Sequence, residues 1–480
     1  MAGNFCYNFM NIEVELLPFY IMQLKQNELQ RIDSASHLLT QLLLSTYNLY
    51  KSGIYVPNYF ENKGENQMPK VTPFQSVRPV PNLAPRIAAL PYDVYDRREA
   101  LSEVQREPLS FLKIDRAETQ FPDDVDTYDP RVYAKAKELL DGMIADGSFI
   151  KEETPCYYIY ELIMDGRSQT GIAACSSVDD YQNQIIKKHE NTREEKELDR
   201  IRHVDITNAH TGPVFLIYRS VQKINEIIST AKKEIPLYDF ISSDGITHRV
   251  WRISNADLLT QLETLFAQIP CTYIADGHHR CASAVKVGLN RRTIHPDYTG
   301  EEEFNRFLSV LFPDDQLYIM PYNRVVRDLN GLSEKAFLEA VKNAGFSVEY
   351  KGKMQVMPEK KGTFGMYLKN DWYLLTASDA LFSTDPVKGL DVSILQDHLL
   401  EAILKIKDPR TDKRIDFVGG IRGLDELERR VSSDMAVAFS MFATSIEELL
   451  SVADAGLLMP PKSTWFEPKL RSGLFIHKLT

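Results

Sequence analysis

Hydrophobic and polar positions along the chain follow two periods, one typical of helices and the other of strands. Apolar runs such as 213–219 predict buried strands, and the amphipathic stretch 129–147 predicts a helix that begins at Pro130. Residues 156–178 predict a hairpin whose turn contains Asp165 and Gly166. Because strands and helices alternate, we expect an α/β (α+β mixed) fold with a mixed sheet.

The same pattern divides the chain into parts. Residues 1–67 predict an amphipathic helix over 28–53, and Met68 is followed by a sequence typical of a protein start. We therefore expect 1–67 to be an N-terminal extension without a catalytic role. The remaining expected parts are a main α/β domain over 68–332, a small α+β segment over 333–388, and a C-terminal part over 389–480 that packs on the main domain.

Composition and charge exclude several classes of function. The formal net charge is -11 and the pI is about 5.5, which disfavours general binding to nucleic acid or anionic membranes. No stretch has the apolar length of a membrane span. The five cysteines are scattered and form no CxxC pair, which favours a reducing compartment. We expect a cytoplasmic protein without a membrane or nucleic-acid partner, for which a homodimer is one allowed assembly.

The stretch "TYIADGHHRCASAVKVG", 272–288, carries the strongest chemical signal. It predicts a strand, a tight turn and an alanine-rich helix, so the first N–H groups of the helix point outward and favour an anion. Gly277 allows close approach of a ligand, and Arg280 can bind phosphate or carboxylate through paired N–H groups. Asp276, His278 and His279 can accept or donate protons. The alternative is that Asp276 only caps the helix and both histidines lie at the surface.

Three other stretches contain candidate residues. In "PRIAALPYDVYD" we expect a strand over 85–96 that turns at Pro91, Tyr92 and Asp93, either beside a ligand or as an ordinary proline turn. Near the C-terminus, a loop with Gly and Pro residues carries Lys462, Ser463, Thr464, Lys469 and Arg471. This loop lacks the glycine spacing of a P-loop, so we expect either a loop that closes over phosphates or a docked tail.

The third stretch is "KKHENTREEKELDR", 187–200. His189, Glu190, Thr192, Lys196 and Arg200 include i, i+4 spacings, so we expect several of them to share one helix face. The alternative is a charged helix that is simply solvated.

Two resemblances follow from these residues. "DGHHRCASA" resembles the ParB/sulfiredoxin-type motif, in which a Gly-x-x-Arg turn opens a helix and holds nucleotide phosphate. The chain from Met68 onward resembles the family of domain of unknown function 1015, through "FQSVRPVP", "LPYDVYD", "KKHENTREEKELDRIRHVDITNAHTGPVFLIY", "YIADGHHR", "YNRVV" and "MPPKSTWFEPKLRSGLFIHKL". No cysteine stands at the catalytic place of sulfiredoxin, and no basic helix-turn-helix is evident. Both departures argue against peroxiredoxin repair and DNA partitioning.

These resemblances imply a function. The ParB-like grouping includes nucleotide-dependent kinases of free serine, and members of the 1015 family tend to lie beside serine-biosynthesis genes. The "RHE-x-T" signature of the family matches His189, Glu190 and Thr192, which makes Glu190 the candidate base and His189 a candidate phosphate ligand. Gly277, His278, Arg280, Lys462 and Ser463 complete the expected nucleotide site.

The leading hypothesis is therefore a nucleotide-dependent phosphotransferase that acts on a small hydroxyl metabolite, with free L-serine as the first candidate. We expect ATP or ADP as cofactor, with Mg²⁺ bridging phosphates and carboxylates, and assign no residue as a dedicated metal ligand. The alternatives are a ParB-like nucleotide-binding regulatory module without turnover, a phosphoserine phosphatase-type hydrolase, and a scaffold for enzymes of the serine pathway.

Overall fold

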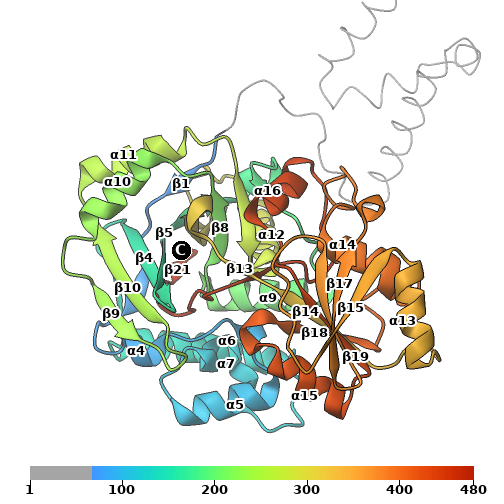
Figure 1. The fold of residues 1–480 in the computed structure, drawn as a ribbon. Coiled ribbons are helices and arrows are strands. Elements are labelled where there is room, and N and C mark those ends of the chain that lie inside the picture. Colours follow the sequence, from blue (N-terminus) through green and yellow to red (C-terminus); the bar gives the residue numbers. More distant parts are fainter. Residues whose placement is uncertain (1–67) are drawn as a thin grey trace, which may run out of the picture. The chain divides into compact units, whose positions relative to one another are not determined.

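A nine-stranded mixed sheet is the framework of residues 68–480, the part of the chain that this computed structural model describes (Figure 1). The helix expected over 28–53 lies outside these residues. The strand order is β6-β11-β8-β12-β5-β4-β10-β9, with β1 beside β5. The strands are β1 (Val71–Thr72), β4 (Tyr157–Met164), β5 (Arg167–Ser177), β6 (Ile186–Lys187), β8 (Val214–Tyr218), β9 (Tyr238–Ile241), β10 (Thr247–Ile253), β11 (Thr272–Asp276) and β12 (Arg306–Pro313).

Both strand directions occur in this sheet. β12 runs parallel to β8, and β11 runs parallel to β6, whereas the β4–β5 hairpin is antiparallel. The hairpin turns through Asp165 and Gly166, which both have positive φ, as the sequence predicts. The predicted mixed α/β fold is therefore confirmed.

The two faces of the sheet are covered by different material. Helices α10 (Gln222–Ala231), α11 (Ala256–Phe266) and α12 (His278–Ile294) pack on one face, where Leu262 and Cys281 belong to the same buried cluster as Ile159. On the other face, the ring of Phe475 lies 5.2 Å from that of Tyr158. The C-terminal segment therefore forms part of the core.

A second sheet takes strands from 322–441, drawn in orange and red tones in Figure 1. Its order is β15-β17-β16-β19-β14-β18, and every pairing is antiparallel. The strands are β14 (Tyr322–Val326), β15 (Phe346–Gly352), β16 (Thr363–Leu368), β17 (Asp371–Ala377), β18 (Ile415–Gly419) and β19 (Val437–Met441). Helices α13 (Glu334–Asn343) and α15 (Asp425–Ser433) pack on it through Phe337 and Leu427. The expected boundaries at 333 and 389 stay a prediction.

A helical layer precedes the hairpin and contains α4 (Ala84–Ile87), α5 (Arg97–Arg106), α6 (Leu112–Asp115) and α7 (Pro130–Ala145). The prediction for α7 is confirmed, because Asp129 accepts a hydrogen bond from the Arg131 N–H and Pro130 is the first helical residue. The strand expected over 85–96 is wrong. Its apolar residues form α4 and the 3-10 helix η3 (Tyr92–Val94), and Ile87 packs against the helical layer instead of joining the sheet.

Residues 465–478 run across the molecule and pair with two short strands that lie far apart in the sequence. β20 (Trp465–Phe466) pairs with β13 (Ile319–Met320), and β21 (His477–Lys478) pairs with β7 (Ala209–His210). Between them Arg471 donates to Ser242 Oγ at 3.0 Å and lies 3.3 Å from His248 Nε2. This crossing brings C-terminal side chains to the start of α12. None of the helices within residues 68–480 has the length and apolar character needed to span a bilayer.

Candidate functional site

The turn between β11 and α12 has the geometry that the sequence predicts. Gly277 has φ 87°, a left-handed conformation that favours glycine. A Cβ at this position would lie 2.8 Å from Arg280 Nε, so the turn also needs the space. No side chain caps the helix, so its first N–H groups lack the partner that an N-cap residue normally supplies. The start of α12 is therefore suited to an anion, provided that cations lie nearby.

Two cations converge on the carboxylate beside this turn. Lys469 Nζ and an Arg280 Nη each lie 3.4 Å from Asp276 Oδ2. Arg280 also donates to the Pro213 carbonyl at 2.6 Å, and Lys469 Nζ lies 5.0 Å from the centroid of the Trp465 ring. Burial alone would raise the pKa of Asp276, but Lys469 and Arg280 outweigh it and hold this pKa well below its usual range. Asp276 is thus ionised and a poor proton acceptor.

Two buried imidazoles lie next to each other at the same place. The rings of His189 and His278 are perpendicular, with centroids 4.6 Å apart, and His189 Nε2 lies 3.5 Å from Thr464 Oγ1. Nε2 of His278 is buried, and no residue within 68–480 forms a hydrogen bond with it. Burial lowers the pKa of His189 to about 4 and that of His278 well below its usual range. Both rings are therefore neutral near pH 7, and His278 can bind a further polar group.

Glu190 is the carboxylate with the properties of a base. Its Oε2 lies 4.0 Å from His278 Nδ1, and its side chain is 43% exposed. Burial raises the pKa of Glu190, with Asp276 acting in the same direction and Lys462 against it. Glu190 therefore binds protons more readily than Asp276 does.

Other predicted residues have structural partners. His279 Nε2 accepts the Arg193 backbone N–H at 3.0 Å, which ties the loop before α9 (Glu194–Thr207) to α12, and burial lowers the pKa of His279. Thr192 donates to Glu197 at 2.6 Å. The buried Ser463 donates to the Pro460 carbonyl at 2.6 Å, so its hydroxyl proton is already used.

The expected shared helix face is confirmed for Lys196 and Arg200 and is wrong for His189, Glu190 and Thr192. Helix α9 (Glu194–Thr207) begins after Thr192, so only Lys196 and Arg200 of the five residues lie on it. His189 and Glu190 instead lie in the loop between β6 and α9, and this loop places them beside His278. The charge run conceals the boundary, because helix-favouring residues such as Lys188, Glu190 and Arg193 already precede Glu194.

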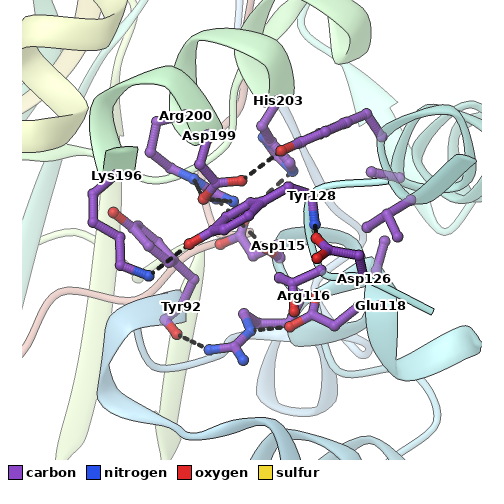
Figure 2. A pocket seen from close by; sticks show the side chains of 15 residues that line it. Tyr92, Asp115, Arg116, Glu118, Asp126, Tyr128, Lys196, Asp199, Arg200 and His203 are labelled. Carbon is purple, nitrogen blue, oxygen red and sulfur yellow. Dashed lines mark hydrogen bonds and ion pairs between the residues drawn. The ribbon is translucent and has the colours of Figure 1, made fainter. Parts of the chain in front are cut away.

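A polar cavity of about 200 Å³ lies between α7 and α9, and the sequence predicted few of its residues (Figure 2). Arg200 pairs with Asp199 at 2.9 Å and lies 4.0 Å from the centroid of the Tyr92 ring, whose hydroxyl has no hydrogen bond within 68–480. Lys196 donates to Tyr128 at 3.0 Å. One feature of the sequence could have indicated this cavity. Lys196, Arg200 and His203 recur at helical spacing and form a polar face on α9.

A smaller cavity of about 30 Å³ connects this region with the turn. It is lined by Arg280 and Ser472, and it shares Tyr92, Asp115, Arg200 and His203 with the larger cavity. Arg280 thus lines only the smaller cavity, whereas Lys469, Asp276 and His278 cluster at the turn between β11 and α12 and line neither cavity. Within residues 68–480, no group of three or more His, Cys, Asp or Glu side chains is arranged to hold a metal ion.

Comparisons with known proteins place the chain in a family. A free serine kinase in complex with AMP is 15% identical with a TM-score of 0.32, covering 66% of this chain and 92% of that one. A conserved hypothetical protein from Pyrococcus furiosus is 16% identical with a TM-score of 0.31, covering 64% and 94%. No curated protein matches in sequence. The model of the family described as "Protein of unknown function (DUF1015)" matches residues 71–393, more than half of the chain, and the chain belongs to this family.

Proposed function

We propose that this protein is a nucleotide-dependent phosphotransferase that acts on a small hydroxyl compound, with free L-serine as the first candidate. The observation that carries the proposal is the convergence of Lys469 and Arg280 on the uncapped start of α12, beside a carboxylate of raised pKa, Glu190. Phosphoryl transfer depends mainly on positioning and on charge stabilisation, and these groups supply both.

The phosphate-binding role falls to groups that remain free to accept an anion. Lys469 and Arg280 each contact one oxygen of Asp276 at 3.4 Å, which is longer than a strong ion-pair hydrogen bond, and Arg280 is also held by the Pro213 carbonyl. The N–H groups at the start of α12 and the unpaired Nε2 of His278 add further polar partners. Lys462, in the left-handed region at φ 61°, lies near Glu190 and can approach a bound phosphate.

The proton-accepting role falls to Glu190 rather than Asp276. A base works best when its pKa lies near the working pH. The pKa of Glu190 is raised by burial, whereas two cations depress that of Asp276. Glu190 therefore takes the proton of the acceptor hydroxyl, and Asp276 fixes the positions of Lys469 and Arg280.

The donor groups fit a nucleotide better than a resident metal ion. The cations and amide N–H groups match phosphate oxygens. Mg²⁺ in phosphoryl transfer needs only one or two protein carboxylates because substrate phosphates supply other ligands. A bound Mg²⁺, held mainly by phosphate oxygens, would neutralise phosphate charge and would leave Glu190 free to act as the base. L-serine is proposed because "DGHHRCASA" resembles the ParB/sulfiredoxin-type motif, and that grouping includes kinases of free serine.

The test is incubation of the whole chain with L-serine, Mg²⁺ and either ATP or ADP, followed by detection of phosphoserine. Lys462→Gln should reduce product formation, because it removes a positive charge near Glu190 that can approach a bound phosphate. The fold should be spared, because Lys462 makes no ion pair within the described residues. Lys407→Gln, at an exposed lysine, is the matched control. Nucleotide binding without product in every combination would favour a regulatory module, and release of inorganic phosphate from phosphoserine would favour a hydrolase.

A further inference from the structure

A hydrogen-bonded chain of three side chains leads from the protein surface into the interior near Arg280. The pairing of β7 with β21 places His210 opposite His477. Nδ1 of His210 lies 3.1 Å from Nδ1 of His477, and Nε2 of His477 lies 2.6 Å from Glu303 Oε2. The Glu303 side chain is 40% exposed, whereas both histidines are buried. The chain thus has an outer end at Glu303 and an inner end at His210.

The positions of the protons follow from these distances. Burial raises the pKa of Glu303, but the hydrogen bond with His477 and the nearby cations outweigh it, so the pKa is lowered and the carboxylate can only accept. His477 therefore donates from Nε2. The bond between the two Nδ1 atoms holds one proton, which resides on either ring. In the first arrangement the shared proton is on Nδ1 of His210. His477 is then neutral, and Nε2 of His210 carries no proton.

The other arrangement differs by one added proton. When the shared proton resides on His477, that ring is an imidazolium beside Glu303, and neutral His210 carries its own proton on Nε2. Uptake of a proton at Nε2 of His210 therefore places the positive charge on His477. Burial, together with His477 and Arg291, lowers the pKa of His210 well below its usual range, which disfavours the charge on His210 itself.

The inner end of the chain opens on the smaller cavity. Nε2 of His210 is buried and has no hydrogen-bond partner within residues 68–480. His210 lines the cavity of about 30 Å³, which has space for one water molecule or one hydroxyl group. Other charged or titratable groups at this cavity are Tyr92, Asp115, Arg200, His203 and Arg280, and Arg306 and Lys151 lie near Glu303 at the outer end.

We propose that Glu303, His477 and His210 form a proton relay, in which His210 Nε2 accepts a proton from the O–H group of a water molecule or small hydroxyl compound in the smaller cavity. The O–H bond breaks, the Nε2–H bond forms, and the electron pair stays on the oxygen, near Arg280. The proton between the two Nδ1 atoms moves to His477. The imidazolium then releases its Nε2 proton to Glu303 or to water at the surface. Glu303 and His477 act through His210 and are positioning residues.

The relay goes beyond the proposed phosphotransferase and rests on it only if the hydroxyl group belongs to the phosphate acceptor. A first experiment is independent of activity. Histidine-selective ¹⁵N labelling of the whole chain, with His210→Gln for assignment, should show His210 protonated on Nδ1 and not on Nε2 above neutral pH. On acidification, Nε2 of His210 should gain its proton at the same pH at which His477 becomes an imidazolium.

A second variant changes the partly exposed Glu303 and leaves the buried His210 and His477 unaltered. Glu303→Gln should lower the pH of this joint transition, because no carboxylate then holds the imidazolium. The relay is overturned if His210 is protonated on Nε2 while His477 is neutral, or if the two rings titrate independently.

Phosphoserine formation separates the two sources of the hydroxyl group. A loss of about 100-fold in His210→Gln, with no loss in the exposed control His295→Gln, would assign the hydroxyl to the acceptor and would give His210, in place of Glu190, the role of its base. An unchanged rate in His210→Gln would assign it to water. Absence of product from the unmodified chain would contradict the proposed function alone, and the ¹⁵N result would still decide whether the relay exists.

Discussion

The imidazole rings of His189 and His278 lie perpendicular to each other, with centroids 4.6 Å apart. This contact joins the loop before α9 to the first turn of α12, and it brings Glu190 to the same end of the helix. Because both rings are buried and neutral, they add polar atoms to the site without adding positive charge. The charge that attracts an anion comes from Lys469 and Arg280.

We expect Glu190→Gln to reduce the rate of phosphoserine formation by about 100-fold or more, the usual contribution of a general base. Nucleotide binding, measured by thermal shift, should persist, since Gln keeps the shape of the side chain. In the unmodified protein the rate should rise with pH through a pKa above the ordinary 4.5 of Glu, because burial raises the pKa of Glu190. This rise of the rate with pH should disappear in Glu190→Gln, and an unchanged pH profile in the variant would rule out Glu190 as the base.

The low pKa of His189 predicts how stability depends on pH. Between the folded value of about 4 and the ordinary 6.5, the unfolded chain binds more protons, so the free energy of unfolding should fall as pH falls across this window. The loss attributable to His189 is roughly 3 kcal/mol. Urea unfolding at pH 7 and pH 4.5 should show a smaller loss in His189→Gln than in the unmodified chain. Equal losses in the two proteins would contradict the burial of a neutral His189.

Alanine variants of Gly277 and Gly147 can separate two costs of a side chain at Gly277. One cost comes from steric crowding and the other from the left-handed backbone conformation. Gly277 and Gly147 have φ 87° and 81°, but a Cβ meets Arg280 Nε at 2.8 Å at the first position and nothing within 4 Å at the second. Both alanine variants should lose about 1–2 kcal/mol because of the left-handed conformation. Gly277→Ala should lose about 1–3 kcal/mol more in urea unfolding, since Arg280 is held by Pro213 and Asp276. Equal losses would show that Arg280 moves freely.

Trp465 should report on ligands at Lys469. Lys469 Nζ lies 5.0 Å from the centroid of the Trp465 ring, so a phosphate that draws the lysine away should change the fluorescence of this indole. We expect ATP or ADP to change the emission of the unmodified chain, and Trp465→Phe to abolish the change while nucleotide still binds. Lys469→Gln should weaken binding at least about 10-fold, as expected for loss of a charge-assisted contact. An emission change that persists in Trp465→Phe would place the nucleotide elsewhere.

The local part of the site could be predicted from the sequence. The strand, the turn at Gly277 and the helix after it all follow from short-range pattern, and each is present as expected. The association of His189 with His278 could not, because it depends on how a loop packs against a distant helix. For the same reason the strand expected over 85–96 is wrong: its apolar residues are buried by the helical layer, which local periodicity does not reveal.

The separation of Lys469 from Asp276 along the chain has a consequence for biosynthesis. The two residues are 193 positions apart, so Asp276 leaves the ribosome well before its lysine partner. At about 5–20 residues per second, the delay is roughly 10–40 s. During translation β11 and the start of α12 therefore emerge with an incompletely compensated carboxylate, and the anion-binding cluster can mature only once the C-terminal crossing has been made.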